Sequence, residues 1–170
     1  MRTKLRFMIL AFAALAVFAI MSLAGAETAK GRSVYHFVKI ERVEVGDVPG
    51  HVVGVAEHRG LMSLDTGEVA THIGRLTFDY TNGSGAFHGY NLVTFEDGSA
   101  KIFEAQGKTT AQPSGVSKFE ASYAYIKGTG RFEGIEGTGS FTGKRIAPLT
   151  AGASADCYLD FMETYTVPAR

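Results

Sequence analysis

A short glycine-rich pattern occurs three times in the chain, at residues 83–89, 128–134 and 137–143. Each copy reads Gly-[Ser/Thr]-Gly-x-Phe-x-Gly, so in an extended strand its three glycines and its phenylalanine share one face. Glycine inside a strand marks a bend, a bulge or a close backbone approach, and a neighbouring aromatic ring can cover the backbone that it leaves bare. The pattern therefore predicts strongly coiled strands, which small barrels need and flat sheets do not.

Alternating and β-rich runs, separated by short turns, follow one another along most of the remaining chain. Turn dipeptides such as Asn82-Gly83 and Asp97-Gly98 join neighbouring runs as hairpins. About eight strands with short connections predict an all-β antiparallel sandwich or closed barrel, in which closure removes exposed edge strands. The expected strands are Val34–Val45, His51–Met62, Val69–Thr81, Ala86–Glu96, Ser99–Thr109, Val116–Ile126, Gly137–Ile146 and Asp156–Val167.

The first 26 residues have the organisation of a cleaved signal peptide. Arg2, Lys4 and Arg6 form a basic start, an uncharged apolar run follows, and Ala24-Gly25-Ala26 is a small-residue cleavage site. Cleavage there leaves residues 27–170 as one β-barrel domain with no membrane anchor. We therefore expect an exported protein, either periplasmic or secreted.

Charge and cysteine content narrow the functional classes. All 17 acidic residues but only 14 of the 17 basic ones follow Ala26, so the mature chain carries a net charge of −3. This balance argues against a nucleic-acid partner and against a basic membrane-binding face. Cys157 is the only cysteine, so an intrachain disulfide is excluded, and its apolar strand context indicates a buried small side chain more than a nucleophile.

The stretch 125–137 resembles a segment of the allene oxide cyclase and dirigent β-barrel superfamily, "GGTGKFxGxxG", and Phe95-Glu96-Asp97-Gly98-Ser99 is similar to the "F-x-D-G-S" hairpin of the same group. The resemblance implies a calycin-like, eight-stranded antiparallel barrel with a hydrophobic interior cavity, and in many members a homotrimer. Members cyclise a fatty-acid epoxide or steer the coupling of phenoxy radicals. Their catalytic residues cannot be matched to this chain, so the resemblance implies a fold and no reaction.

Several other readings of the motifs are weaker. The Gly-x-Gly copies lack the spacing and the following helix of a nucleotide-binding loop, and they lack the aspartates of a calcium-binding β-roll. The five histidines, His36, His51, His58, His72 and His88, show no i, i+2 or i, i+4 metal spacing. We therefore expect no cofactor and no metal, and we interpret the glycine copies as a bending device.

Polar and aromatic residues on apolar strand faces are the candidates for a barrel interior. Glu104 shares a face with Ile102, and burial there would raise its pKa and make it a candidate acid or base. The alternative is that Glu104 faces solvent while Phe103 and Ala105 face the core. The candidate ligand-binding residues are His72, Tyr80, Tyr90, Glu104, Tyr123 and Tyr125.

These observations favour an exported β-barrel that binds a hydrophobic small molecule in its interior, since an eight-stranded barrel is about the size that holds one small ligand. Two alternatives stay open. One is a cofactor-independent cyclase or isomerase that uses the same cavity, and the other is a structural or interaction protein with a filled core.

Overall fold

Eight strands and one short 3-10 helix make up most of the chain that the computed structural model describes, residues 25–146 and 156–169. The strands are β1 (Glu27–Glu44), β2 (His51–Leu64), β3 (Val69–Thr81), β4 (Ser84–Phe95), β5 (Ala100–Ala111), β6 (Ser117–Thr129), β7 (Glu136–Arg145) and β8 (Asp156–Thr166). The helix η1 (Gly130–Phe132) lies between β6 and β7. All eight expected strands are present, and the largest difference is that β1 begins seven positions earlier, at Glu27 instead of Val34.

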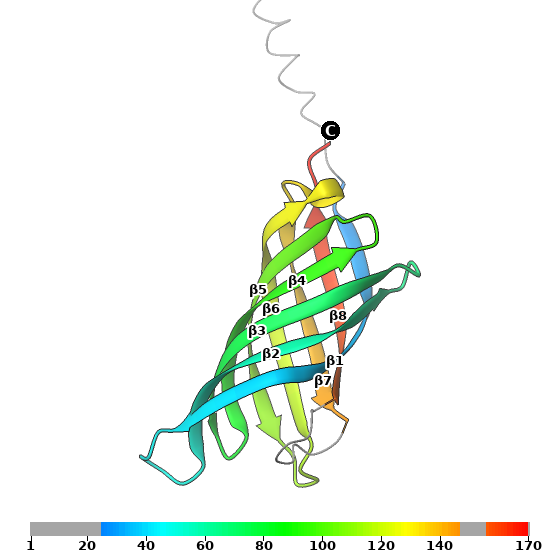
Figure 1. Ribbon diagram of the computed structural model, residues 1–170. Helices are drawn as coiled ribbons and strands as arrows, with labels where there is room; N and C mark the ends of the chain where they lie inside the picture. Colours follow the sequence, from blue (N-terminus) through cyan, green and yellow to red (C-terminus); the bar gives the residue numbers. More distant parts are fainter. Residues whose placement is uncertain (1–24, 147–155, 170) are drawn as a thin grey trace, which may run out of the picture.

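Each strand pairs antiparallel with the next, and β8 pairs with β1, which closes the sheet into a barrel (Figure 1). The predicted eight-stranded antiparallel β-barrel is therefore confirmed. Most of the predicted signal peptide lies outside the described residues. Within the described residues, no helix is long and apolar enough to span a membrane.

The three glycine-rich copies adopt two different structures. In β7, Gly139 and Gly143 lie on the inner face, where the rings of Tyr123 and Phe119 occupy the space that a Cβ would take. This is the predicted aromatic cover of a glycine strand. The copy at 83–89 begins in the hairpin turn Asn82-Gly83, where both residues have positive φ, and continues as β4.

The copy at 128–134 does not form the strand face that its sequence predicts. Gly130 and Gly134 have positive φ, and the chain leaves β6, forms η1 and turns back. Phe132 is buried there and packs against Phe95 with ring centroids 5.0 Å apart. This copy of the glycine-rich motif therefore closes one end of the barrel instead of bending a strand.

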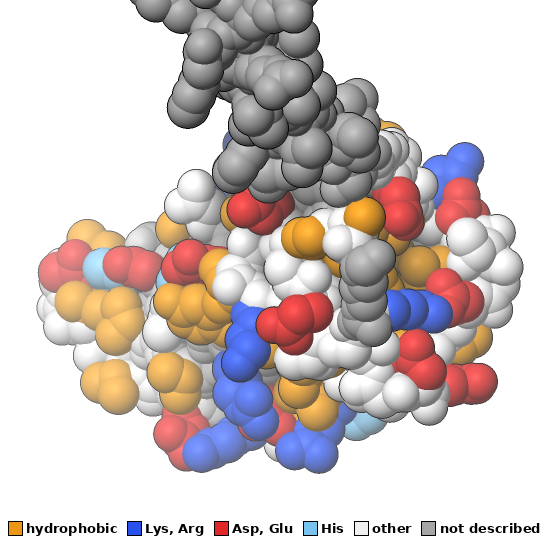
Figure 2. Space-filling model, turned by 90° about the horizontal axis from the view of Figure 1, so that it is seen from above, with side chains coloured by type: hydrophobic (Ala, Val, Ile, Leu, Met, Phe, Trp, Pro, Cys, Tyr) orange, Lys and Arg blue, Asp and Glu red, His pale blue; other side chains and the backbone are white. Residues whose placement is uncertain are grey.

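The two ends of the barrel differ. The end that carries η1, uppermost in Figure 1, is filled by aromatic side chains, and we call it the closed end. At the opposite end, β7 finishes and β8 begins, and we call it the open end. The hairpin of β1 and β2 projects sideways from this end, and Figure 2 shows hydrophobic side chains over the projection, mixed with acidic ones. Its exposed hydrophobic residues include Val43, Val48 and Val53.

Candidate functional site

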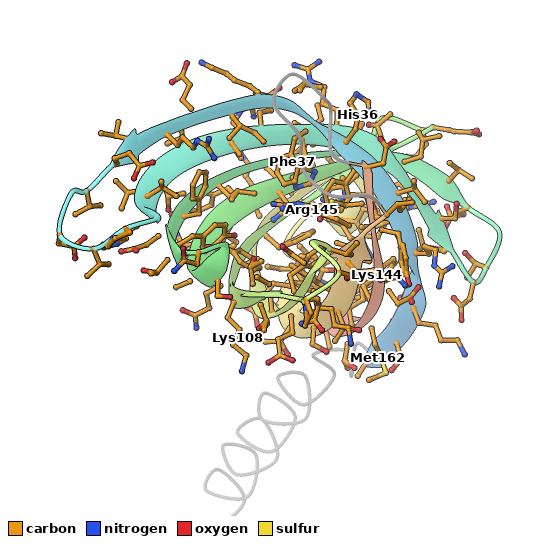
Figure 3. The ribbon with its side chains drawn as sticks, turned by 90° about the horizontal axis from the view of Figure 1, so that it is seen from below. His36, Phe37, Lys108, Lys144, Arg145 and Met162 are labelled. Atoms are coloured by element: carbon orange, nitrogen blue, oxygen red, sulfur yellow. The ribbon has the colours of Figure 1, made fainter. Side chains whose placement is uncertain are left out.

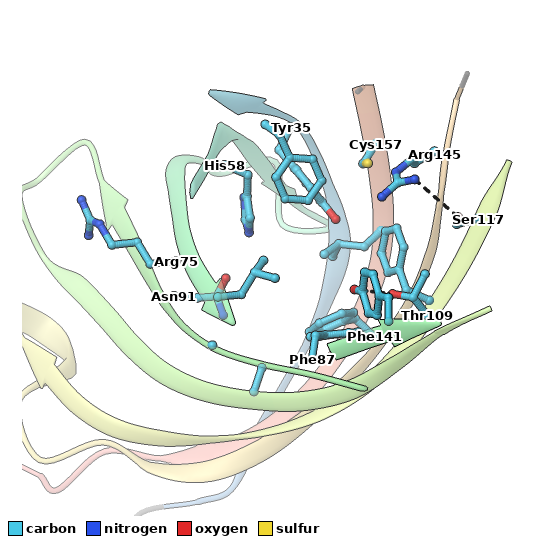
Figure 4. A pocket seen from close by; sticks show the side chains of 17 residues that line it. Tyr35, His58, Arg75, Phe87, Asn91, Thr109, Ser117, Phe141, Arg145 and Cys157 are labelled. Atoms are coloured by element: carbon cyan, nitrogen blue, oxygen red, sulfur yellow. Dashed lines mark hydrogen bonds between the residues drawn. The ribbon is translucent and has the colours of Figure 1, made fainter. Parts of the chain in front are cut away.

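A cavity lies inside the barrel toward the open end. Its inner chamber has a volume of about 60 Å³. A wider mouth of about 220 Å³ adjoins it and shares four of its lining residues, Phe37, Leu76, Tyr80 and Arg145. Figure 3 looks into this end of the barrel, with Arg145 inside the ring of strands, and Figure 4 shows the chamber from close by.

The chamber exists because small residues alternate with aromatic ones at inward positions. Gly89 and Ala105 leave space on β4 and β5, whereas Phe87, Phe119 and Phe141 project from β4, β6 and β7. The rings of Phe87 and Phe141 are nearly parallel, at 21°, with centroids 6.4 Å apart. The wall is therefore largely aromatic, and it suits a flat apolar group.

A polar network lies beneath the chamber, around His72. This imidazole is fully buried, and its Nδ1 lies 2.8 Å from Ser33 Oγ while its Nε2 lies 3.0 Å from Asn91 Oδ1. Burial lowers the pKa of His72 to about 4, although the hydrogen bond to Asn91 acts in the opposite direction. His72 is therefore neutral at pH 7, with both ring nitrogens hydrogen-bonded.

His58 is the least satisfied polar side chain of the interior. Its ring lies against Tyr35, with centroids 4.2 Å apart, and 4.9 Å from the ring of His72. Burial, and then the neighbouring His72, hold the pKa of His58 well below its ordinary value. Its Nδ1 is buried and has no hydrogen-bond partner among the described residues, which costs about 1–3 kcal/mol for a buried polar atom. His58 fits because its neighbour Gly74 has no Cβ, which would lie 2.0 Å from Nε2.

Arg145 places a positive charge on the wall of the chamber. Its Nη1 makes a long contact of 3.5 Å to the hydroxyl of Ser117, drawn in Figure 4. No carboxylate of residues 25–146 or 156–169 lies within ion-pair distance of this guanidinium. An arginine stays charged at any ordinary pH, so the cavity has a fixed cation beside an apolar wall.

Cys157 lies on the same wall and is fully buried, as its sequence context predicts. Burial raises the pKa of its thiol to about 11, although Arg145 and a hydrogen bond with Tyr35 act in the opposite direction. The thiol is therefore protonated at neutral pH, which argues against the alternative reading as a nucleophile.

A second polar cluster fills the closed end. Lys101 Nζ lies 2.7 Å from Glu163 Oε1, and both side chains are buried. Tyr123 and Tyr125 donate their hydroxyls to Glu163 Oε2, and burial raises the pKa of both tyrosines. Lys101 Nζ also lies 4.0 Å from the centroid of the Tyr165 ring. None of these residues lines the chamber or its mouth, so the cluster holds the closed end together.

Four of the six predicted site residues face the interior, and only one lines the cavity. Tyr80 lines both the chamber and the mouth, and its hydroxyl lies 2.8 Å from Thr109 Oγ1. His72 lies in the network beneath the chamber. Tyr123 and Tyr125 face inward but belong to the closed end.

The prediction that Tyr90 faces the interior is wrong, and so is the placement of Glu104 among the interior site residues, because the alternative in which Glu104 faces solvent is the one observed. The inward positions of β5 are those of Phe103 and Ala105, both buried, so Glu104 lies on the outer surface. Its Oε1 accepts hydrogen bonds from His88 Nε2 at 2.7 Å and from the hydroxyl of Tyr90 at 3.1 Å. These two bonds lower the pKa of Glu104, so the raised pKa and the acid or base role that burial would have given it are not found.

Sequence reasoning did not single out His58, Arg145 or the phenylalanines as cavity residues. Phe87 and Phe141 are the phenylalanines of two glycine-rich copies. The shared face of glycines and phenylalanine in each copy could therefore have predicted them as inward residues. Arg145 follows Phe141 and Gly143 at the strand period of two residues, and extending that face by one step would have found it. His58 offered no comparable signal.

No protein-family model matches the chain, and no curated protein matches it by sequence. Among solved structures, the pterocarpan synthase dirigent protein GePTS1 is similar, with a TM-score of 0.51 and 14% identity over 86% of this chain and 93% of that one. A second pterocarpan synthase dirigent protein, PsPTS1, has a TM-score of 0.45 and 13% identity over 84% of this chain and 97% of that one. The first likeness shows that this chain has a dirigent-like β-barrel fold.

Proposed function

We propose that this dirigent-like barrel binds a small, flat and largely apolar molecule in the cavity at its open end. The observation that carries the proposal is the chamber itself, with Phe87, Phe119 and Phe141 on its wall. Apolar pockets with a few convergent polar groups are the usual form of a small-molecule site. His58 and Arg145 supply such groups here.

The size of the cavity sets the size of the ligand. Drug-sized ligands occupy pockets of about 300–1,000 Å³, and the chamber of about 60 Å³ is far smaller. The chamber therefore holds one end of the ligand, and the mouth of about 220 Å³ holds the rest. Leu76 lies where the two meet, because it lines both.

Binding is supported better than a cyclase or isomerase reaction. The described residues that line the inner chamber include no aspartate or glutamate. The two histidines at its base have lowered pKa values, so neither is an effective base near pH 7. The chamber therefore offers orientation and shape, and we assign it no reaction.

Export is the second part of the proposal, and it rests on the basic start, the apolar run and the cleavage site of residues 1–26. The strand β1 begins at Glu27, the residue that follows that site. Intact mass measurement of the protein from a native exporting host should give a chain that begins at Glu27. Recovery of the full-length chain from the cytoplasm alone would contradict export.

Plugging the junction between chamber and mouth tests ligand binding. In the variant Leu76→Trp, a large ring would fill the passage, whereas Thr77→Trp adds the same ring on the outer surface of β3. We expect methyl 6-hydroxy-2-naphthoate, a flat neutral probe, to raise the melting temperature of the wild type and of Thr77→Trp by several degrees at about 100 times its Kd. Leu76→Trp should fold and show no shift. Equal shifts in all three proteins, or none in the wild type, would contradict the proposal.

A further inference from the structure

We infer that the ligand of this cavity is an aromatic carboxylate, with the carboxylate paired to Arg145. The inference rests on the proposed function, because it names the class of molecule that the same cavity takes. Two features of the cavity carry it: a cation without an ion-pair partner among the described residues, and a flat apolar wall.

The positive charge of Arg145 indicates that the ligand carries a negative charge. The groups within reach of the Arg145 guanidinium in the described residues are neutral, chiefly the hydroxyl of Ser117 and the protonated thiol of Cys157. Glu44 lines the mouth with Arg145 but does not form an ion pair with it. A planar guanidinium binds a carboxylate through two parallel hydrogen bonds, and in a poorly hydrated cavity such bonds are strong.

A carboxylate fits this cation better than a phosphate. A phosphate monoester carries a charge of about −1.5 to −2 at pH 7 and three acceptor oxygens. Arg145 is the only cationic side chain shared by the chamber and the mouth among the described residues. Arg75 also borders the chamber, but its Nε pairs with Glu57 Oε2 at 3.0 Å, and Arg42 borders only the mouth, together with Glu44. One guanidinium neutralises one carboxylate, so a single negative charge is what the chamber balances.

The apolar wall of the chamber favours an aromatic body. Phe87 and Phe141 are nearly parallel, and Phe119 meets Phe141 edge to face at 74°. A rigid ring gains stacking against such a wall, and it loses less conformational entropy on binding than an alkyl chain of equal area. The ligand is therefore flat, with an acidic group at its edge.

Calorimetric titration of the wild-type protein with matched naphthalene probes tests the inference. The probes are 6-hydroxy-2-naphthoate and its neutral methyl ester. We expect the acid to bind about tenfold more tightly than the ester, since a hydrogen bond to a charged group is worth about that factor.

Three variants assign the preference to its residues. In Arg145→Gln the ratio of ester to acid dissociation constants should fall to about one, and in Lys144→Gln, which removes an exposed charge from the adjacent position, it should be unchanged. Arg145→Lys keeps the charge and should keep part of the preference. The ratio of the two dissociation constants measured on one variant does not change if that variant binds both probes more weakly by the same factor.

The outcomes separate the two proposals. If the ester binds the wild type as tightly as the acid, or if Arg145→Gln keeps the preference, the inference is wrong and the cavity remains a site for neutral molecules. If no naphthalene probe binds the wild type, the proposed function fails and the inference fails with it. Should Arg145→Gln not fold, the acid-to-ester ratio of the wild type and of Arg145→Lys still decides.

Discussion

Buried polar side chains, more than apolar ones, distinguish the interior of this barrel at the level of single residues. His72 has a partner for each ring nitrogen, whereas His58, whose ring lies 4.9 Å away, leaves Nδ1 without one. Lys101 and Glu163 form a buried ion pair, and two tyrosines hydrogen-bond the remaining carboxylate oxygen. A satisfied network fixes structure, whereas a buried polar atom without a partner costs stability.

The buried histidines make the stability of the protein depend on pH. The pKa of His72 falls from 6.5 to about 4 on folding, so between these values the unfolded chain binds a proton that the folded chain does not. The free energy of unfolding should therefore decrease as the pH falls from about 6.5, by about 3 kcal/mol from His72 alone once pH 4 is reached. His58 acts in the same direction.

Urea unfolding of the wild type and of His72→Gln at pH values between about 7 and 4.5 measures this effect. The variant should be less stable at pH 7 but lose less stability on acidification. His51, whose pKa is raised by hydrogen bonds to Asp79 and Asp47, acts oppositely: its stabilisation is complete below pH 6.5 and lost as the pH rises through the raised pKa. A wild-type stability that does not change between pH 7 and 5, or equal slopes in the two proteins, would contradict the account.

At the level of elements, the strand pattern could be predicted from the sequence and the inner face could not. Alternation and turn dipeptides located all eight strands, because the side-chain period of two and the turn chemistry are local properties. Local sequence did not separate the copy at 137–143, which is a strand, from the copy at 128–134, which is a turn. Glu104 shows that local sequence does not tell which face of a strand points into the barrel. If the wrong face is chosen, every inward and outward residue of that strand is exchanged.

A methyl group added inside β7 tests the role of the glycine-rich face. In Gly139→Ala the new Cβ would lie 2.2 Å from Cζ of the buried Tyr123 ring, so the ring or the strand must move. We expect a loss of about 1–3 kcal/mol in the free energy of unfolding, as for other overpacked sites. Ser140→Ala, on the exposed face of the same strand, should change it by no more than about 0.5 kcal/mol. Equal stability of the two variants in urea unfolding would show that the glycine face is not needed for packing.

The whole molecule divides its interior into a sealed half and an accessible half. Lys101 and Glu163 lie among aromatic rings at the closed end, and the cavity with Arg145 lies at the open end. The barrel fold was predictable, because strand number, short turns and the glycine motif all pointed to it. The site was not, because its walls come from all eight strands, and their side chains meet only once the register of the closed sheet is known.

A crystal structure of the protein soaked with 6-hydroxy-2-naphthoate tests the central claim most directly. We expect electron density for the probe with one end beside Phe87 and Phe119 in the chamber and the rest in the mouth, and with the carboxylate within hydrogen-bond distance of Arg145. Density for the probe on the outer surface alone, with the chamber empty, would contradict it.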